Sequence, residues 1–174
     1  MTLSVEQLTR AHRALLKGFT SGEPSLDLYI RRWALRHQER DLLGRTWLAV
    51  DRNNTERLAG YFTLAAAIVE RDLVTEGPLN KLPRFPIPAV LLARLAVDQR
   101  IQGQGLGTWL FDEALGRTIR LAAEGPFGFR VLVADAKNER AAQFYAKHGL
   151  ERLGRHGEWP CRMLLDLKPL VGSR

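Results

Sequence analysis

The chain has 174 residues, of which 45% are apolar and 26% charged, and this balance fits one globular domain over residues 1–174 with a buried core. It lacks an apolar run of about 18 residues and a basic segment followed by an apolar core at its start, so we expect a cytoplasmic protein without a membrane span. Cys161 is the single cysteine, which excludes an internal disulfide and a cysteine metal cluster, while the net charge of +7 favours a polyanionic or acidic partner.

The first third of the chain predicts a short strand and two helices. Residues 3–8 form the strand, and residues 11–18 form a brief helix that ends at Gly18. The Ser-Gly-Glu-Pro stretch at 21–24 signals a second helix, because proline suits the first helical turn. Four arginines follow on this helix: Arg31, Arg32, Arg36 and Arg40. They are either a solvated polar face or a track for phosphates, since arginine pairs with phosphate without base preference.

The middle of the chain predicts three strands and a long loop. Residues 46–50 and 58–69 form a hairpin with a turn at 51–54. Glycine and proline residues between 70 and 88 predict a loop with one short helical turn. Because long loops in compact domains are often functional, we expect this one beside the acceptor site. An apolar run over 89–98 then predicts a mostly buried strand.

Three glycines at alternate positions follow this strand: Gly103, Gly105 and Gly107. A helical pattern begins at about residue 106, and this order of strand, glycine loop and helix is typical of an anion site for a pyrophosphate. A Rossmann fingerprint requires glycine where Thr108 stands, and a P-loop requires a Gly-Lys-Ser/Thr ending that the loop lacks. The remaining pattern is Q/R-x-x-G-x-G/A, which begins at Gln102.

The last third predicts a strand, a helix and a strand. Gly125-Pro126 ends the preceding helix, and residues 129–134 form a second buried strand. A helix capped by Asp135 or Asn138 then runs to Gly149. Residues 162–167 form a last strand, and residues 171–174 a frayed tail. This order implies an α/β fold with a mixed sheet and helices on both faces.

The glycine pattern resembles the coenzyme A motif of the GNAT N-acetyltransferases. Residues 138–150 resemble the N-x-x-A-x-x-F-Y-x-x-x-G-F segment of the same superfamily, with Leu150 in place of the usual aromatic residue. The resemblance covers about residues 46–167. Within the superfamily the chain is most similar to the acetyltransferase toxins of type II toxin–antitoxin pairs, through residues 19–30, 60–64 and 86–98.

This resemblance implies the GNAT fold, a central and mostly antiparallel sheet with a splayed parallel pair, and it implies acetyl-CoA as the cosubstrate. The pantetheine arm would pair with backbone groups of Leu95 and Val97, and Asn138 would bond it from the other side. The pyrophosphate would be held by the residues of the glycine loop: Gln102, Gly103, Gly105, Gly107 and Thr108.

Tyr145, placed by the Phe-Tyr pair of the motif, is the predicted catalytic residue. A phenol facing the sulfur stabilises or protonates the departing thiolate. The alternative is a helix aromatic that packs in the core. The general base stays open among four carboxylates: Glu70, Asp98, Asp135 and Glu139. The α-amine of an aminoacyl ester is partly neutral near pH 7 and needs no strong base. The histidines show no metal-ligand spacing, so we expect no metal.

Taken together, the resemblance implies a toxin that acetylates the α-amino group of aminoacyl-tRNA and blocks translation, with the four helix arginines as tRNA contacts. Two alternatives stay open. One is a GNAT enzyme that acts on a small amine or a protein N-terminus, and the other is a non-enzymatic GNAT-fold regulator that binds nucleic acid. The implied partners are a cognate antitoxin of the ribbon–helix–helix type and a second copy of the chain as a homodimer.

Overall fold

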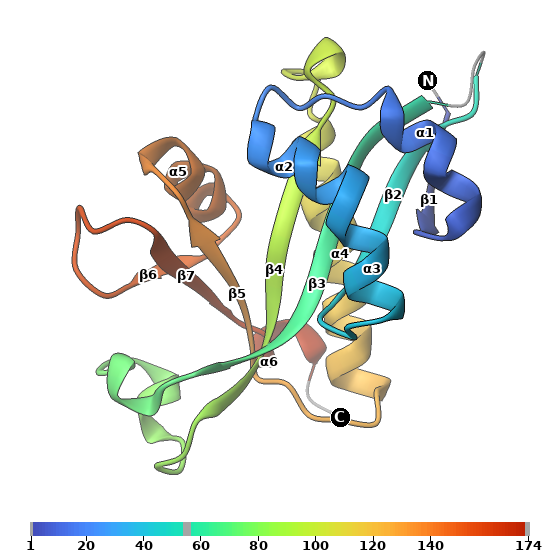
Figure 1. Ribbon diagram of the computed structural model, residues 1–174. Coiled ribbons are helices and arrows are strands. Elements are labelled where there is room, and N and C mark those ends of the chain that lie inside the picture. The colour runs from blue at the N-terminus through green and yellow to red at the C-terminus, as the bar shows by residue number, and fades with distance from the viewer. Residues whose placement is uncertain (1, 54–56, 173–174) are drawn as a thin grey trace. The chain divides into compact units, whose positions relative to one another are not determined.

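The structure is a computed structural model that describes residues 2–53 and 57–172 (Figure 1). Its strands are β1 Leu3–Gln7, β2 Arg45–Asp51, β3 Arg57–Val69, β4 Ile87–Val97, β5 Val131–Ala136, β6 Glu151–Leu153 and β7 Cys161–Asp166. Its α-helices are α1 Arg13–Lys17, α2 Pro24–Leu28, α3 Ala34–Glu39, α4 Leu106–Glu124, α5 Glu139–Lys147 and α6 Lys168–Val171. Five short turns of other helix types are η1 Arg10–His12, η2 Tyr29–Trp33, η3 Arg71–Leu73, η4 Pro78–Lys81 and η5 Gln99–Ile101.

Within the described residues the strands form a seven-stranded sheet in the order β1-β2-β3-β4-β5-β7-β6. β4 and β5 run parallel, whereas β1–β2, β2–β3, β5–β7 and β6–β7 are antiparallel. The predicted α/β fold with a mixed and mostly antiparallel sheet is therefore confirmed. The chain divides into two compact units. The first unit comprises residues 1–65 and 93–114, and the second comprises residues 66–92 and 115–174.

In the first unit, β3 carries a bulge that depends on a glycine. The register of β3 against β2 shifts between Ala49 and Val50, which leaves Ala59 as the extra residue. Gly60 follows, and a Cβ at this position would lie 2.6 Å from Leu110 Cδ1. No side chain fits there, so Gly60 allows β3 and the start of α4 to approach closely.

Helices cover both faces of the sheet in the first unit. Gly60 and Tyr61 are consecutive strand residues, so their side-chain directions are opposite. Tyr61 is fully buried in a cluster that includes Tyr29 and Ile30 of η2, whereas Gly60 faces Leu110 of α4. Figure 1 shows α2 and α3 in front of β3, and the first half of α4 behind it. The prediction of helices on both faces is thus confirmed in this unit.

The helix predicted to start near Pro24 is continuous from α2 through η2 to α3. Pro24 stands in its first turn, as predicted. Its middle turn, η2, is π-helical, which widens the backbone spiral by one residue. The first unit also contains the predicted short helix, since η1 and α1 run from Arg10 to Lys17 and Gly18 follows as the C-cap.

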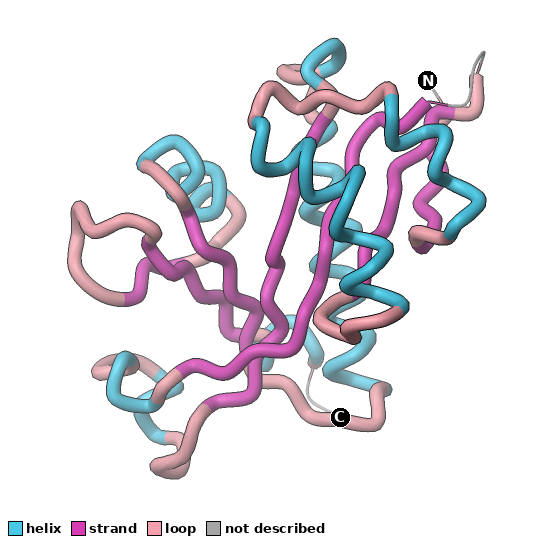
Figure 2. The backbone as a smooth tube through the Cα atoms, in the orientation of Figure 1, coloured by secondary structure: helices cyan, strands magenta, loops and turns pink. Residues whose placement is uncertain are grey.

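The second unit is built around β5. β4 pairs with it in parallel from Ala89–Val131 to Leu92–Ala134, and β7 pairs with its other edge. The predicted long loop contains two short turns, η3 and η4, where one was expected (Figure 2). The Arg71 guanidinium holds this loop together, because it donates to the carbonyls of Val74, Asn80 and Leu82.

Several boundaries differ from the predictions. β5 begins at Val131, two residues later than expected, and the Arg130 N–H bonds the Pro88 carbonyl at 2.9 Å just before the β4–β5 ladder. β6 and α6 were not predicted, since three- and four-residue elements leave little periodic pattern. The turn expected at 51–54 includes residue 54, and the tail expected at 171–174 includes residues 173–174; these three lie outside the described residues.

No helix in the described part of the chain combines the length and apolar character that crossing a membrane requires.

Candidate active site

The glycine turn, residues 102–107, leads from η5 into α4 in the first unit. Gly103 and Gly105 have φ angles of 78° and 81°, a left-handed conformation that glycine adopts without strain. A Cβ on either glycine would meet no described atom within 4 Å, so both face open space. The Trp109 N–H bonds the Gly105 carbonyl at 3.1 Å, and the N–H groups before it in α4 precede the first helical bond. The turn therefore presents N–H groups and a positive helix end to an anion.

Asp98 and Arg100 fix the start of this turn. The Asp98 carboxylate is fully buried and accepts hydrogen bonds from the Arg100 guanidinium at 2.6 and 2.8 Å. The Asp98 N–H donates to the bulge carbonyl of Ala59 at 2.8 Å, and Arg100 also donates to the Gly18 carbonyl at 3.1 Å. Burial raises the pKa of Asp98, but the bonds from Arg100 outweigh it and hold the pKa below its ordinary value.

A loop over residues 18–22 is bonded to the glycine turn through Gln102. The Gln102 side-chain amide donates to the Ser21 carbonyl at 2.8 Å and to the Val97 carbonyl at 3.0 Å. Asp27 shapes the same loop, because its carboxylate accepts bonds from the Ser21 N–H at 2.8 Å and from the Thr20 hydroxyl at 3.1 Å. The Gln102 side chain thus closes the turn, and a phosphate contact from this residue would come from its backbone N–H.

Leu95 and Val97 lie half-buried on the last part of β4, in the first unit. The ladder between β4 and β5 ends at Leu92, whereas β4 continues to Val97. The backbone groups of Leu95 and Val97 are therefore not part of that ladder.

Helix α5 carries Tyr145 and belongs to the second unit. Asn138 caps it, since its side-chain oxygen accepts a bond from the Ala141 N–H at 2.9 Å, and Gly149 follows its end with a φ of 89°. Both are as predicted. Burial raises the pKa of the half-buried Tyr145 phenol to about 12, and the charge of Asp135 adds to this shift. Tyr145 is thus a neutral phenol that retains its proton well above pH 7.

Ion pairs occupy most of the candidate bases. Three of the four carboxylates pair with arginine: Asp98 with Arg100, Asp135 with Arg162, and Glu139 with Arg152. The Asp135 pair has two bonds, of 2.8 and 2.9 Å. Glu70 precedes η3, where its carbonyl accepts a bond from the Leu73 N–H. Three of the four candidate bases are therefore held in ion pairs within the protein.

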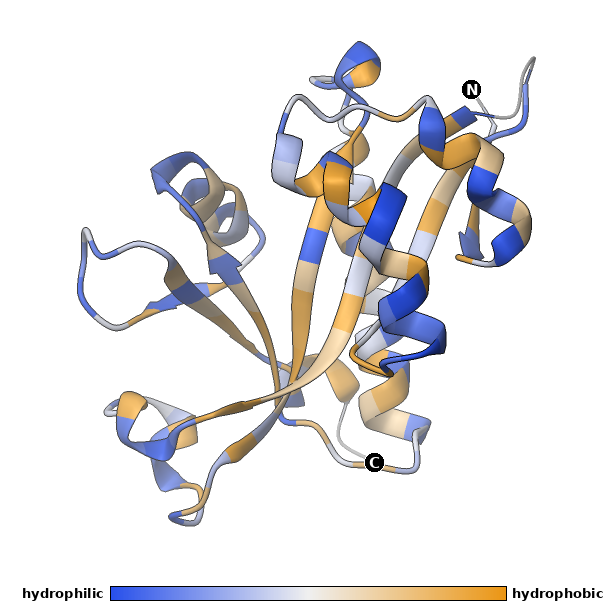
Figure 3. Ribbon diagram, in the orientation of Figure 1, coloured by the Kyte–Doolittle hydropathy of each residue, from blue (hydrophilic) through white to orange (hydrophobic). Residues whose placement is uncertain are grey.

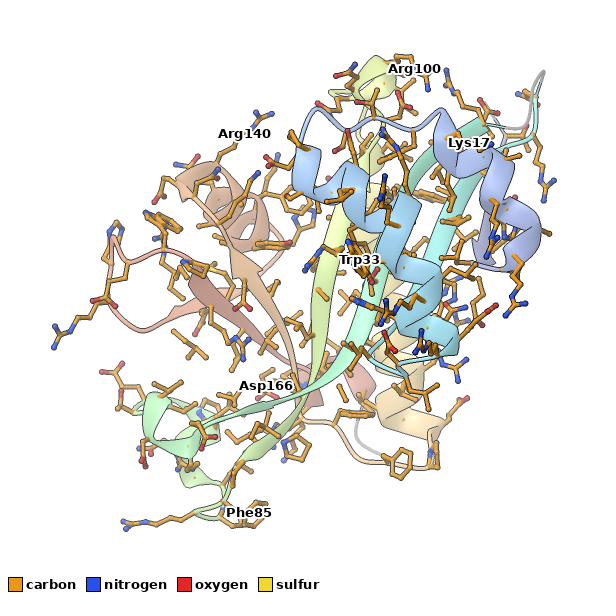
Figure 4. All side chains as sticks on the ribbon, in the orientation of Figure 1. Lys17, Trp33, Phe85, Arg100, Arg140 and Asp166 are labelled. Carbon is orange, nitrogen blue, oxygen red and sulfur yellow. The ribbon has the colours of Figure 1, made fainter. Side chains whose placement is uncertain are left out.

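A basic groove of about 730 Å³ lies in the first unit, between η1–α1 and the η2–α3 part of the long helix. Seven cations line it: Arg10, Arg13, Lys17, Arg31, Arg32, Arg36 and Arg40. Glu39 is the acidic residue in its lining, and it pairs with Arg10 at 2.9 Å. Hydrophilic residues dominate α3 in Figure 3, and Figure 4 labels Lys17 on α1 and Trp33 on η2.

The four predicted helix arginines are all exposed in this groove, but they differ in their contacts. Arg31 donates to the Phe19 carbonyl at 2.6 Å and so supports the loop before Pro24. Arg36 pairs with Asp41 at 3.0 Å, and Arg40 lies 4.0 Å from the same carboxylate. The sequence did not reveal the second wall of the groove, because its residues lie about one helix earlier in the chain.

Among the described residues, no group of three or more His, Cys, Asp or Glu side chains is arranged to hold a metal ion. The predicted site residues fall into two groups. The first unit contains Leu95, Val97, the glycine turn and the arginine helix, and the second contains Asn138 and Tyr145.

Residues 43–152 match the acetyltransferase (GNAT) domain family. The chain therefore belongs to the GNAT family and is an acyltransferase, which confirms the resemblance on which the site was predicted.

Its relatives narrow this class. The chain is 35% identical over 155 residues to the "tRNA-acetylating toxin" of Mycobacterium tuberculosis, with 89% of each chain covered. It is similar to a crystal structure of a Tyr-to-Phe variant of KacT, with a TM-score of 0.87, 26% identity and 98% of both chains covered.

It is also similar to AtaT complexed with acetyl-methionyl-tRNA, with a TM-score of 0.85, 28% identity and 97% of both chains covered. Other AtaT structures with 28% identity contain acetyl-CoA, at a TM-score of 0.77, or the C-terminus of the antitoxin AtaR, at a TM-score of 0.78. They cover 97% of this chain and 95% of the AtaT chain.

Proposed function

We propose that this protein uses acetyl-CoA to acetylate the α-amino group of aminoacyl-tRNA, and that it thereby blocks translation as a toxin. The observation that carries the proposal is the similarity to a tRNA-acetylating toxin over 89% of the chain. The basic groove supports it, because seven cations in one groove suit a polyphosphate acceptor better than a small amine.

The glycine turn is the group that binds the pyrophosphate of acetyl-CoA. Positive φ angles at Gly103 and Gly105 turn the loop so that it offers backbone N–H groups, which Gln102, Gly107 and Thr108 extend. The residues present fit the group, since the two glycines leave open space where a side chain would stand. The backbone of Leu95 and Val97 binds the amide-rich arm, because it lies beyond the β4–β5 ladder. Asn138 contributes through the part of its amide that does not cap α5.

Tyr145 is the general acid of the proposed reaction. Acetyl-CoA supplies a thioester carbonyl, which the acceptor amine attacks. The Tyr145 phenol, which its raised pKa keeps protonated, donates its proton to the departing sulfur as the C–S bond breaks, and the proton that the nitrogen loses as the amide forms restores the phenol. No carboxylate is needed to deprotonate the amine, because the α-amine of an aminoacyl ester is partly neutral near pH 7.

Further parts of the proposal concern assembly. We infer that residues 1–174 act as one GNAT domain, that two copies form a homodimer, and that a ribbon–helix–helix antitoxin with an acidic tail neutralises the toxin. The AtaT structure with the C-terminus of AtaR supports an antitoxin partner, and the basic groove is suited to acidic residues. Co-purification with the product of a neighbouring gene, followed by mass measurement of the complex, tests both partners.

The decisive experiment offers labelled acetyl-CoA and three acceptors to the purified protein: charged tRNA, uncharged tRNA and a set of small amines and peptides. We expect label in charged tRNA alone, and growth arrest when the protein is expressed. Label in a small amine or peptide, with none in charged tRNA, contradicts the proposed substrate and favours the other acceptor class.

The basic groove is tested by charge reversal at two of its cations, Arg32 and Arg13. Unlike Arg31, whose side chain bonds the Phe19 carbonyl, neither is described in a side-chain hydrogen bond or ion pair. Arg32→Glu with Arg13→Glu should lower kcat/KM for charged tRNA about 100-fold at low salt, and the difference should shrink as salt rises. Arg120→Glu, at an exposed position of α4 outside the groove, is the matched control and should change little. If both variants behave alike, the groove is only a solvated surface.

A further inference from the structure

Arg94, in the middle of β4, has surroundings that the predicted site does not explain. Its side chain is exposed, and its guanidinium carbon lies 4.9 Å from the centre of the Tyr29 ring. Its Nη1 donates to the neighbouring Ala93 carbonyl at 2.7 Å. One face of the guanidinium is therefore stacked on an aromatic ring, and the Nε and Nη2 edge has no acceptor among the described residues.

Arg94 lacks the carboxylate partner that several arginines on and beside the other strands have. Four of these are paired: Arg57 with Asp51, Arg130 with Asp166, Arg152 with Glu139, and Arg162 with Asp135. Among the described residues, no Asp or Glu oxygen lies within 4.0 Å of the Arg94 guanidinium. A charge in a strand that the protein itself does not neutralise is available to an anion.

The aromatic platform beneath Arg94 is rigid. Tyr29 is buried, with 8% of its surface exposed, and it stacks on Tyr61 with ring centres 6.3 Å apart. The Tyr61 hydroxyl donates to the Leu26 carbonyl at 2.8 Å, and Phe19 packs edge-on against Tyr61. The long helix and β3 thus hold the platform, which reduces the rotamer entropy that Arg94 loses when it binds a ligand.

The position of Arg94 along β4 identifies the face of the sheet on which its side chain lies. Side chains alternate along a strand, so Arg94 and Ala96 share one face, while Leu95 and Val97 point to the other. Ala96 is buried in the cluster under the long helix, together with Tyr29. Arg94 is therefore on the helix-covered face, one residue from the Leu95 backbone that is proposed to bind the acetyl donor.

We propose that Arg94 binds the phosphate nearest to the reacting amine, the one on the 5′ side of the terminal adenosine that carries the amino acid. This inference rests on the proposed function. The guanidinium edge offers two parallel N–H groups, which match two phosphate oxygens, and the Tyr29 stack aims that edge. Arg94 is in this role a residue that positions the acceptor and selects for nucleotide-linked amines, distinct from the general acid Tyr145.

The experiment compares two acceptors that differ by one phosphate. Both are adenosine with an amide-linked 3′-amino acid of the kind that wild-type protein accepts on tRNA, and one has a 5′-phosphate. We expect Arg94→Gln to lower kcat/KM for the phosphorylated acceptor about 10- to 100-fold, and to change that for the unphosphorylated acceptor less than about twofold. An equal loss on both acceptors, or no loss on either, overturns the inference.

Two further variants separate binding from folding. Tyr29→Phe keeps the ring under Arg94 and should match wild type, whereas Arg94→Lys keeps the charge, loses the fork and should recover only part of the phosphate effect. Arg152→Gln is the matched control, because Arg152 also lies over an aromatic ring, Trp159, but is paired with Glu139. Arg152→Gln should keep the wild-type ratio of kcat/KM between the two acceptors.

The wild-type protein supplies the last control. If it leaves charged tRNA unmodified, the proposed function fails. If it acetylates charged tRNA and Arg94→Gln shows the wild-type ratio between the two acceptors, only the inference about Arg94 fails.

Discussion

The glycine turn and helix α5 perform their proposed parts by opposite means. At the turn, backbone N–H groups are proposed to bind the ligand, and the surrounding side chains hold the turn in place. Arg100 and Gln102 both donate to carbonyls of the 18–22 loop. In α5 the backbone is an ordinary capped helix, and one side chain, Tyr145, carries the chemistry. Binding by backbone groups depends on the conformation of the turn, whereas the proposed role of Tyr145 depends on its hydroxyl group.

This difference teaches how each region tolerates substitution. A side chain that supports the turn can be replaced wherever another donor reaches the same carbonyl. A substitution that changes the φ angle of a turn glycine alters the turn itself. In α5, an isosteric change that removes the oxygen of Tyr145 should leave the fold intact and remove the proposed function. Stability and activity should therefore separate in α5 and change together at the turn.

The largest expected effect is that of Tyr145→Phe. Loss of the phenolic hydroxyl should lower kcat about 10²- to 10⁴-fold, because the departing sulfur loses its proton donor. The melting temperature and the affinity for coenzyme A should stay close to wild type. Steady-state acetyl transfer, calorimetry and thermal unfolding measure the three quantities, and a fully active variant removes Tyr145 from the mechanism.

The pH dependence of the rate sharpens the same assignment. Since the pKa of Tyr145 is about 12, the acid form predominates throughout the range from pH 7 to pH 10. We therefore expect that ionisation of Tyr145 causes no fall in wild-type kcat between pH 7 and pH 10. A falling limb near pH 9 that disappears in the variant contradicts a burial-raised phenol pKa.

The next effect is that of Gly105→Ala. A φ of 81° costs a non-glycine residue about 1–2 kcal/mol, although the new Cβ meets no atom within 4 Å. Coenzyme A affinity should fall roughly tenfold and the free energy of unfolding by about 1 kcal/mol. Gly116→Ala in the interior of α4 is the control, because its Cβ is equally unobstructed and its φ is not positive. Wild-type affinity in Gly105→Ala contradicts a turn held by conformation.

The smallest expected effect concerns Asp98, which supports the glycine turn, and it is a change in the free energy of unfolding at acidic pH. The pKa values of Asp98 and Asp27 lie below their ordinary values, because hydrogen bonds to the charged carboxylates outweigh the effect of burial. Their contribution to stability is therefore complete above about pH 4, the unfolded value, and is lost as the pH falls through the folded values. Asp98→Asn should be less stable than wild type at pH 7, and the gap should narrow towards pH 2.5 in urea unfolding. A gap that is constant with pH contradicts a charged Asp98.

Most of the fold was predictable because it depends on local pattern. Pro24, the apolar run before the glycines and the period of α4 each indicate an element within a few residues of where it lies. The glycine turn was predictable for the same reason, since only glycine adopts φ angles near +80° without strain. The short elements β6 and α6 were not, because they depend on neighbours in space.

The roles of the side chains that support the glycine turn were harder to predict. Asp27 and Asp98 stand in segments that resemble the toxins, but only their hydrogen bonds assign them to the support of the glycine turn. The resemblance identified where they are, while the bond partners explained what they do.

The sequence by itself determined the family, the order of the elements, the glycine turn and the tyrosine of α5, because each rests on residues close together in the chain. Tertiary structure decided which carboxylates are neutralised, which helix completes the basic groove, and that Arg94 lies on Tyr29 without an acidic partner. These features join residues that are far apart in the chain, and no spacing in a single sequence encodes such a meeting. Burial and pairing, which set the charge of a side chain and its availability to a ligand, exist only once the chain has folded.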